Sequence, residues 1–435
     1  MPRKLKLDSN LYCLTQKLMT IKDFIAHYWQ HLIVALLTIG VFCFWLFLYP
    51  FIPVAREMSL LFLWNTDYLM ERLMIPGGLA QYLGEGVTQF FLNPVNSAII
   101  YAILFVVTQF LTSKLLRQFF PKLKDKYLFV LSLIPPIILW RVAMLPHIPL
   151  TPTIAVLLVM GVGCAIMGIS SKKTRLIILC VMIPIMYWLT GPAAILLILC
   201  CIRWIPLTAT LFAACLIGSS YLVPYPMEQI AKGIDYNWSG VKEMGTYEEM
   251  ECDMLIRQKK WDKILHQFQS PTSPAVRIAT IIAAYKSGQI SYQELISKIV
   301  VSAEKFDREP SVFCFDDSFF IVYFGSVSSA FIVSETASML CWPNISQRAA
   351  FEAMEYVPNH NKSARALKQL AENCIITGQF ALANKYLSIL EDTTFYRHWA
   401  QEMRAVVDNP KLIENYPFMK KSQETYASSK DIFFI

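Results

Sequence analysis

Residues 176–202 read LIILCVMIPIMYWLTGPAAILLILCCI, an apolar run that is interrupted by Leu189-Thr190-Gly191-Pro192. A helix needs about 20 apolar residues to cross the hydrocarbon core of a membrane, so this run can form one long span or two shorter ones. Proline removes a backbone donor and disfavours helix at the residue before it. A single kinked helix predicts six spans in the whole chain, whereas two helices meeting at Gly191-Pro192 predict seven.

The chain divides into an apolar first half and a polar second half. Residues 1–223 carry 17 Lys and Arg against 7 Asp and Glu, whereas residues 224–435 carry 22 against 25. The 435 residues are 55% hydrophobic, which is too apolar for an ordinary soluble protein and predicts an integral membrane protein. We assign the basic excess to membrane flanks and expect no nucleic-acid partner.

Six apolar segments are candidates for membrane spans. They are residues 31–54, 94–112, 127–145, 151–169, 176–202 and 206–223. These segments predict an all-α fold that begins with a polytopic transmembrane helical bundle over residues 31–223, behind a basic N-terminus over 1–30. The basic start is long and the first apolar stretch begins only near His31, so we expect a retained first span and not a removed signal peptide.

Basic residues alternate between the connections of these segments. They cluster in the N-terminus, in 113–126 and in 171–175, whereas the connections 56–93 and 141–150 contain few. Because cytoplasmic connections carry the excess of Lys and Arg, we expect a cytoplasmic N-terminus. We favour seven spans, which place the second half outside the cytoplasm; six spans would place it inside.

The connection 56–93 is too apolar to be a bare linker. Its apolar residues recur at helical spacing, which predicts one or two amphipathic helices in the membrane interface, broken at Pro76-Gly77-Gly78. Asp67 and Glu71 lie four residues apart, on one helical face, and Glu85 follows. They either form a solvated helix face or include a carboxylate that removes a proton from an acceptor hydroxyl.

Three further residues lie near the same outer boundary. Arg56, Arg141 and His147 are candidates for binding a lipid phosphate. Each could equally be an interfacial residue whose polar end reaches water. Membrane lipids are therefore expected partners.

The layout of this half resembles the shared module of C-type glycosyltransferases. The likeness rests on a long, acidic outer first loop followed by a fifth span that breaks at Leu189-Thr190-Gly191-Pro192. The resemblance implies seven spans and the transfer of a sugar from a polyprenyl-phosphate-linked glycan to an acceptor on the outer face. It implies Asp67 as the base, with Glu71 and Glu85 as supporting carboxylates.

Residues 224–435 have the pattern of an α-helical hairpin solenoid. In residues 367–386, the Gly378 turn is followed by Phe380, Ala383 and Tyr386 at helical spacing, which is similar to a tetratricopeptide unit. An earlier pair over 247–268 turns at Lys259-Lys260, and a helix over 274–287 ends at Gly288. Such arrays commonly bind a protein partner, although this one could also dock on its own membrane domain.

Three segments, 351–367, 261–264 and 395–400, resemble an uncharacterised family of bacterial multi-pass membrane proteins with tetratricopeptide-like tails. The family implies the bacterial cytoplasmic (inner) membrane and this architecture, without an activity. Its members usually continue beyond the apolar end at 431–435, so we expect this chain to be shorter than its relatives by a repeat or two, or its end to dock on the array.

Motifs for cofactor chemistry are absent from the sequence. It contains no GxxxxGK[ST], GxGxxG, HExxH or GxSxG pattern, which argues against nucleotide-driven reactions and the commonest hydrolases. Cys252, Cys314, Cys341 and Cys374 form no CxxC pair, so we expect no metal and no cofactor; they could be free thiols or disulfides. Two hypotheses remain: a glycosyltransferase-like enzyme acting on lipid-linked envelope glycans, and a non-catalytic scaffold whose repeats bind a protein partner.

Overall fold

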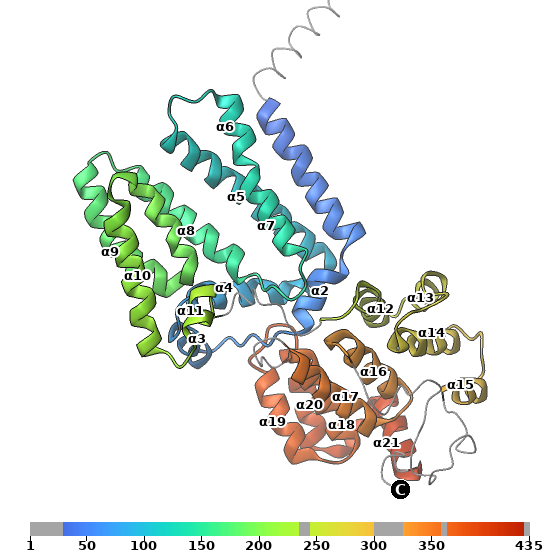
Figure 1. Cartoon of the computed structure of the whole chain (residues 1–435). Helices are drawn as coiled ribbons and strands as arrows, with labels where there is room; N and C mark the ends of the chain where they lie inside the picture. The colour runs from blue at the N-terminus through green and yellow to red at the C-terminus, as the bar shows by residue number, and fades with distance from the viewer. Residues whose placement is uncertain (1–28, 235–243, 300–324, 358–362, 430–435) are drawn as a thin grey trace, which may run out of the picture.

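The computed structural model describes the chain apart from five segments: 1–28, 235–243, 300–324, 358–362 and 430–435. Every regular element among the described residues is a helix (Figure 1), which confirms the all-α prediction. The basic N-terminal residues, Cys314 and the apolar end at 431–435 lie outside the described residues.

The first half forms a bundle of helices with short elements gathered at one end (Figure 1). It begins with the helix Trp29–Leu48, whose last turn is the π-helix η1 (Phe44–Leu48). The elements that follow are α2 (Phe51–Met58), α3 (Thr66–Leu73), α4 (Gly78–Thr88), η2 (Gln89–Leu92), α5 (Pro94–Phe119), α6 (Asp125–Ser132), α7 (Ile134–Ala143), α8 (Thr151–Met167), α9 (Lys172–Thr190), η3 (Gly191–Trp204), α10 (Ile205–Leu222) and α11 (Met227–Lys232).

Five helices in the described part of the chain are long and apolar enough to cross a membrane. They are Trp29–Leu48, Pro94–Phe119, Asp125–Ala143, Lys172–Cys200 and Ile205–Leu222. The apolar helix Thr151–Met167 is shorter. These helices indicate a membrane protein.

The structure corrects the predicted first span. A single span over 31–54 was expected, but the helix ends at Leu48 and a separate helix, α2, begins at Phe51. The physical reason is Pro50, because proline cannot donate the backbone hydrogen bond that would continue the helix. The eight residues of α2 are thereby freed to lie between the bundle and the second half of the chain.

The chain reverses direction at Gly191. By length and composition Lys172–Cys200 counts as one helix, but Gly191 has φ 66° and ψ −147°, which glycine adopts readily. At the start of α9, Arg175 donates a 2.6 Å hydrogen bond to the carbonyl of Ile169, just beyond the end of α8. Gly163, near that same end of α8, packs against Cys200 of η3. Since η3 therefore returns toward the start of α9, the two segments run antiparallel.

The second half is an array of paired helices. Its elements are α12 (Tyr247–Arg257), α13 (Trp261–Gln267), α14 (Pro274–Lys286), α15 (Tyr292–Ile299), α16 (Val327–Met339), α17 (Pro343–Tyr356), α18 (Ala364–Ile376), α19 (Phe380–Leu390), α20 (Arg397–Asp408), η6 (Pro410–Asn415) and α21 (Pro417–Ser429). The turns predicted at Lys259-Lys260, Gly288 and Gly378 all occur between helices.

Four helix pairs share one turn geometry. The turn residue is left-handed in each pair, with φ of 53° at Lys259, 74° at Gly288, 62° at Cys341 and 78° at Gly378. The backbone N–H of the next residue bonds a carbonyl five residues earlier, at 2.7 to 3.0 Å, as in a Schellman cap. These caps set a common turn for α12/α13, α14/α15, α16/α17 and α18/α19.

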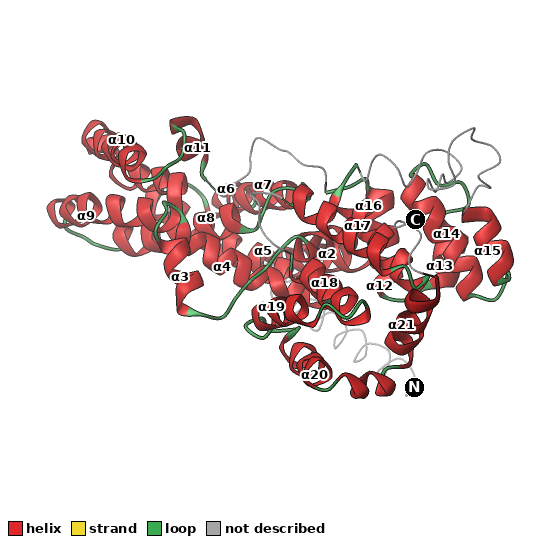
Figure 2. Cartoon of the chain, turned by 90° about the horizontal axis from the view of Figure 1, so that it is seen from below, coloured by secondary structure: helices red, strands yellow, loops and turns green. Residues whose placement is uncertain are grey.

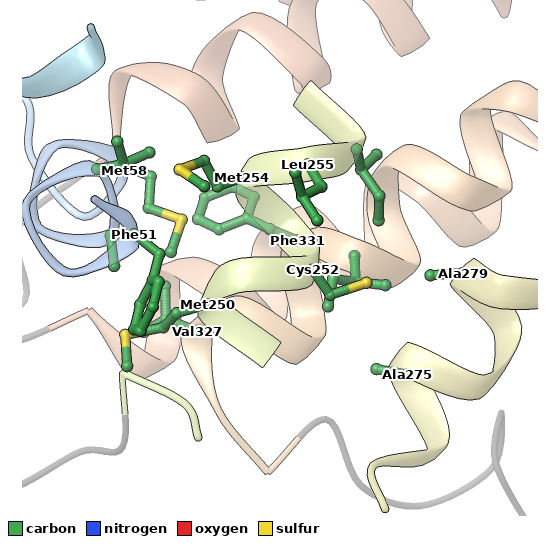
Figure 3. Close-up of a cluster of buried hydrophobic side chains, with 14 of the residues drawn as sticks. Phe51, Met58, Met250, Cys252, Met254, Leu255, Ala275, Ala279, Val327 and Phe331 are labelled. Atoms are coloured by element: carbon green, nitrogen blue, oxygen red, sulfur yellow. The ribbon is translucent and has the colours of Figure 1, made fainter. Parts of the chain in front are cut away.

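The two halves share one hydrophobic core. Figure 3 shows Phe51 and Met58 of α2 beside Met250 and Met254 of α12, with Phe331 of α16 behind them. Figure 2 shows α2 among α5, α12 and α18, and α2 contacts all three. The array is therefore docked on the bundle through α2 and does not hang from it on a linker.

Candidate functional site

Two of the predicted carboxylates lie on the exposed side of α3. Asp67 is in the first turn of this helix, which Asn65 caps by accepting a 2.8 Å hydrogen bond from the backbone N–H of Tyr68. Asp67 is exposed and has no ion-pair partner among the described residues. Glu71 is 71% exposed and lies 3.4 Å from Arg72. Both carboxylates face solvent.

The third carboxylate, Glu85 of α4, is buried in a polar cluster. It accepts hydrogen bonds from the Tyr68 hydroxyl at 2.8 Å, Arg72 Nε at 3.0 Å and Gln81 Nε2 at 3.0 Å. Burial and the charge of Glu85 raise the pKa of Tyr68, so this phenol stays protonated. Arg72 thus links Glu85 to Glu71, but the structure does not place Asp67 in this cluster.

The three predicted phosphate ligands have different environments. Arg56 is buried, and its guanidinium donates to the carbonyls of Ala143, Leu145 and Ile148 and to the Tyr101 hydroxyl. These bonds hold the carbonyl at the end of α7, Ala143, and those of the connection that follows it. Arg141 is exposed. His147 is partly buried, and burial together with the positive charge of Arg56 lowers its pKa, so it is neutral at pH 7.

The turn at Pro76-Gly77-Gly78 and the break in the apolar run are in contact. Gly77 donates a 2.8 Å hydrogen bond to the carbonyl of Trp188, and the Trp188 indole donates to the carbonyl of Leu73 at 2.9 Å. A Cβ on Gly77 would lie 3.6 Å from the backbone of Gly191. The turn at Pro76-Gly77-Gly78 and the reversal at Gly191 therefore pack backbone against backbone.

A buried ion network lies where the two halves meet, and it was not among the sites predicted from the sequence. Its Glu57–Arg257 pair crosses between the halves, whereas both ion pairs of Arg365 lie within the array. The junction network consists of Glu57 in α2, Asp253 and Arg257 in α12, Glu335 in α16 and Arg365 in α18. Arg365 donates to both oxygens of Asp253 at 2.7 and 2.8 Å and to Glu335 at 2.7 and 3.1 Å. Arg257 lies 3.4 Å from Glu57.

The network is largely buried, with Glu335 its most exposed member at 23%. Asp253 is 1% exposed and Arg365 6%. Burial by itself would lower the pKa of Arg365, but the carboxylates of Asp253 and Glu335 raise it well above its usual value. Burial raises the pKa of Glu57 despite Arg257 nearby, while Arg365 holds the pKa of Glu335 below its usual value against the effect of burial. Three carboxylates thus face two guanidinium groups.

The sequence did contain a signal for this network. Asp253 stands in Met250-Glu251-Cys252-Asp253-Met254-Leu255-Ile256, and Arg365 stands between two alanines ahead of Leu367. A charge on an otherwise apolar face must find a partner when that face is buried. Which partner it finds depends on residues more than one hundred positions away.

Residues 59–65 connect α2 to α3 outside any helix and lie between the bundle elements and the array. Leu61 and Leu63 pack into the core that α18, α19, α20 and α21 form. Leu60 and Phe62 pack against Tyr68 and its neighbours on α3 and α4, and Leu63 contacts this cluster as well. Leu61 thus contacts the array, Leu60 and Phe62 contact the neighbourhood of Tyr68, and Leu63 contacts both, so apolar side chains hold the segment on two sides.

The array also holds the backbone of this segment. Ala364 donates a 3.0 Å hydrogen bond to the carbonyl of Leu60, and the N–H of Trp64 donates to the carbonyl of Asp392 at 2.9 Å. Ser363 bonds the carbonyl of Met58. The predicted connection 56–93 therefore has two parts. Residues 66–92 form short helices with the expected break, at residues 74–77, and residues 59–65 are a non-helical segment bound to the array.

Metal and thiol chemistry find little support in the described part of the chain. No group of three or more His, Cys, Asp and Glu side chains there could hold a metal ion. Cys252, Cys341 and Cys374 are buried free thiols. Burial raises the pKa of Cys374 to about 11, so it stays protonated and unreactive.

Together these features define a class: an all-helical membrane protein whose second half is an array of helix pairs docked on the bundle. The chain belongs to a family of unknown function, DUF6057, whose model matches residues 26–435. No curated protein and no solved structure matches it.

Proposed function

We propose that the protein is a membrane-anchored scaffold that holds its helical array in one fixed position on the outer face of the bundle, where the array binds a protein partner. The observation that carries this proposal is the junction network. Fully satisfied buried polar networks rigidify and specify one arrangement, whereas a domain used only as a flexible tail needs no such contact. The tetratricopeptide-like character of the array is part of the same proposal.

The proposal includes seven spans in a bacterial cytoplasmic membrane. The reversal at Gly191 supports it, because α9 and η3 then cross separately. The fourteen residues of η3, at the rise of about 2.0 Å per residue of a 3₁₀ helix, extend about 28 Å. With the N-terminus in the cytoplasm, the array lies outside.

Reporter fusions after Ser429 test this topology. A reporter that is active only outside the cytoplasm should be active there, and its cytoplasmic counterpart should be silent. A cytoplasmic result would contradict seven spans and would move the array, with its partner, to the other side of the membrane.

A second candidate is glycosyl transfer to an acceptor on the outer face. Asp67 favours it, because an exposed carboxylate beside the membrane can act as a base if a hydroxyl comes within hydrogen-bonding reach. The contact between Gly77 and Gly191 also favours it, since it joins the two features that resemble C-type glycosyltransferases. In this version Glu71 and Glu85 support the base, and the exposed Arg141 binds the phosphate of a polyprenyl-linked donor.

Complementation of a deletion strain separates the two candidates. The strain should receive Asp67→Asn, Arg365→Met or, as a surface-charge control, Glu414→Gln, each at matched membrane levels, with lipid-linked glycans measured. The scaffold predicts that Asp67→Asn complements and Arg365→Met fails. The enzyme predicts that Asp67→Asn fails and that lipid-linked glycan accumulates, and this result would contradict the scaffold.

A further inference from the structure

The contacts of residues 59–65 are those of a bound peptide. The array receives this segment through backbone hydrogen bonds at Leu60 and Trp64 and through the apolar contacts of Leu61 and Leu63. Main-chain bonds supply affinity for an extended peptide, and alternate side chains supply selectivity. We name the surface of the array around Ala364 and Asp392, which these contacts define, the peptide groove; the chain occupies it with its own residues.

At the end of the segment near α3, polar contacts with the array add selectivity for particular side chains. Asn65 Nδ2 donates a 3.0 Å hydrogen bond to Asp392, and the Trp64 indole donates to Thr394. Trp64 remains 51% exposed, so this end is open to solvent while Leu61 is enclosed. The groove thus prefers leucines at alternate positions followed by an asparagine.

The segment is also built so that it can leave. No regular element includes residues 59–65, so their withdrawal unwinds no helical turn and gives up only the cap that Asn65 supplies to α3. Their ends are held by α2 and α3, and such tethering gives the segment a high effective concentration in its own groove, about millimolar for a short flexible link. A free competitor must overcome that concentration, so the occupied groove is insensitive to weak ligands.

We propose that this groove is the partner-binding site of the array and that residues 59–65 occupy it in cis as an autoinhibitory ligand. The ligand is an extended apolar segment of a partner protein, with leucines at alternate positions and an asparagine after them, and it binds when the cis segment withdraws. The inference rests on the proposed scaffold function and names the class of its partner.

The test uses full-length protein in nanodiscs and a fluorescent peptide with the sequence of residues 58–66, extended by two lysines for solubility. The opened variant carries Leu61→Ser and Leu63→Ser, which weaken the cis ligand and leave every residue of the array itself unchanged. We expect it to bind the peptide at least about tenfold more tightly than the wild type, because the competing population falls. A peptide with the same two serines should not bind.

A matched groove variant controls for non-specific binding. Ala364→Pro, added to the opened variant, removes the N–H that bonds the carbonyl of Leu60. Ala364 is the first residue of α18, and Ser363 before it has φ −97° and ψ 127°, so proline fits there without disturbing the helix. We expect this variant to lose the gained affinity.

Hydrogen exchange on the wild type gives a readout that does not depend on folding of a variant. Millimolar peptide should increase exchange at the amide of Trp64 if it displaces the cis segment. Unchanged exchange, or an opened variant that is folded but binds no more tightly than the wild type, would overturn the proposal. Either result would leave the scaffold standing if Arg365→Met still failed to complement, since the partner site would then lie elsewhere on the array.

Discussion

Arg365→Met should lower the free energy of unfolding of the array by a measurable amount. The methionine retains most of the side-chain volume over Phe331, whose ring centroid lies 4.4 Å from the guanidinium, but it removes every hydrogen bond to Asp253 and Glu335. Asp253, at 1% exposure, is then an unpaired buried carboxylate. Breaking a buried pair by removing one partner costs about 3–5 kcal/mol.

The assay is thermal unfolding in detergent, followed by circular dichroism, with the reaction of buried thiols such as Cys252 as a second probe. For a domain of this size, about 2–4 °C of melting temperature corresponds to each kcal/mol. The expected decrease is therefore about 6–20 °C.

The double variant Arg365→Met with Asp253→Leu distinguishes a charge effect from a packing effect. Replacing both partners of a buried pair by apolar residues is often neutral, so the double variant should recover most of the lost stability. If the single variant melts within about 2 °C of the wild type, or if the double variant is as unstable as the single one, the reasoning from buried charge is wrong.

The remaining predictions concern turns, close packing and pH. Gly378→Ala should destabilise the array by about 1 kcal/mol, because alanine is strained at φ 78°. Lys259→Gly should raise the melting temperature of the array, because glycine relieves the strain at φ 53°. A shift of the melting temperature in the same direction for both variants would contradict this reasoning. Gly78→Ala should abolish folded protein, because its Cβ would lie 1.8 Å from a backbone oxygen; Gly161→Ala, which meets nothing within 4 Å, should be harmless, and size-exclusion profiles compare the two. Burial raises the pKa of Glu57 above its ordinary 4.5, so the folded state retains a proton that the unfolded chain loses. The contribution of Glu57 to stability should therefore fall as pH rises from 4.5 through the raised pKa, and melting curves of Glu57→Gln should lack that slope.

Local features of the sequence determined the helical class and much of the turn structure. Apolar length identified the candidate spans, and Gly378 and Gly288 marked turns because glycine enters the left-handed region at little cost. Cys341 makes the same cap without any such signal. No single-residue preference predicts a left-handed conformation at Cys341.

The positions of charged residues in the sequence did not predict where their side chains point. Arg56 was predicted to reach a lipid phosphate, since an arginine beside an apolar run commonly reaches the interface. In the structure its donors bond the carbonyl at the end of α7 and that of Leu145 just beyond it. Sequence position near a boundary does not say whether a guanidinium points to lipid or into the protein.

By itself, then, the sequence determined that the chain is helical, that its first half suits a membrane and that its second half is a series of helix pairs. These properties follow from periodicity and composition, which act over a few turns of helix. Only the tertiary structure decided that Glu57, Asp253 and Arg365 meet, that η3 returns along α9 and that residues 59–65 bind the array. Those contacts join residues far apart in the chain, and their energies exist only once burial has removed the water that would otherwise satisfy each group.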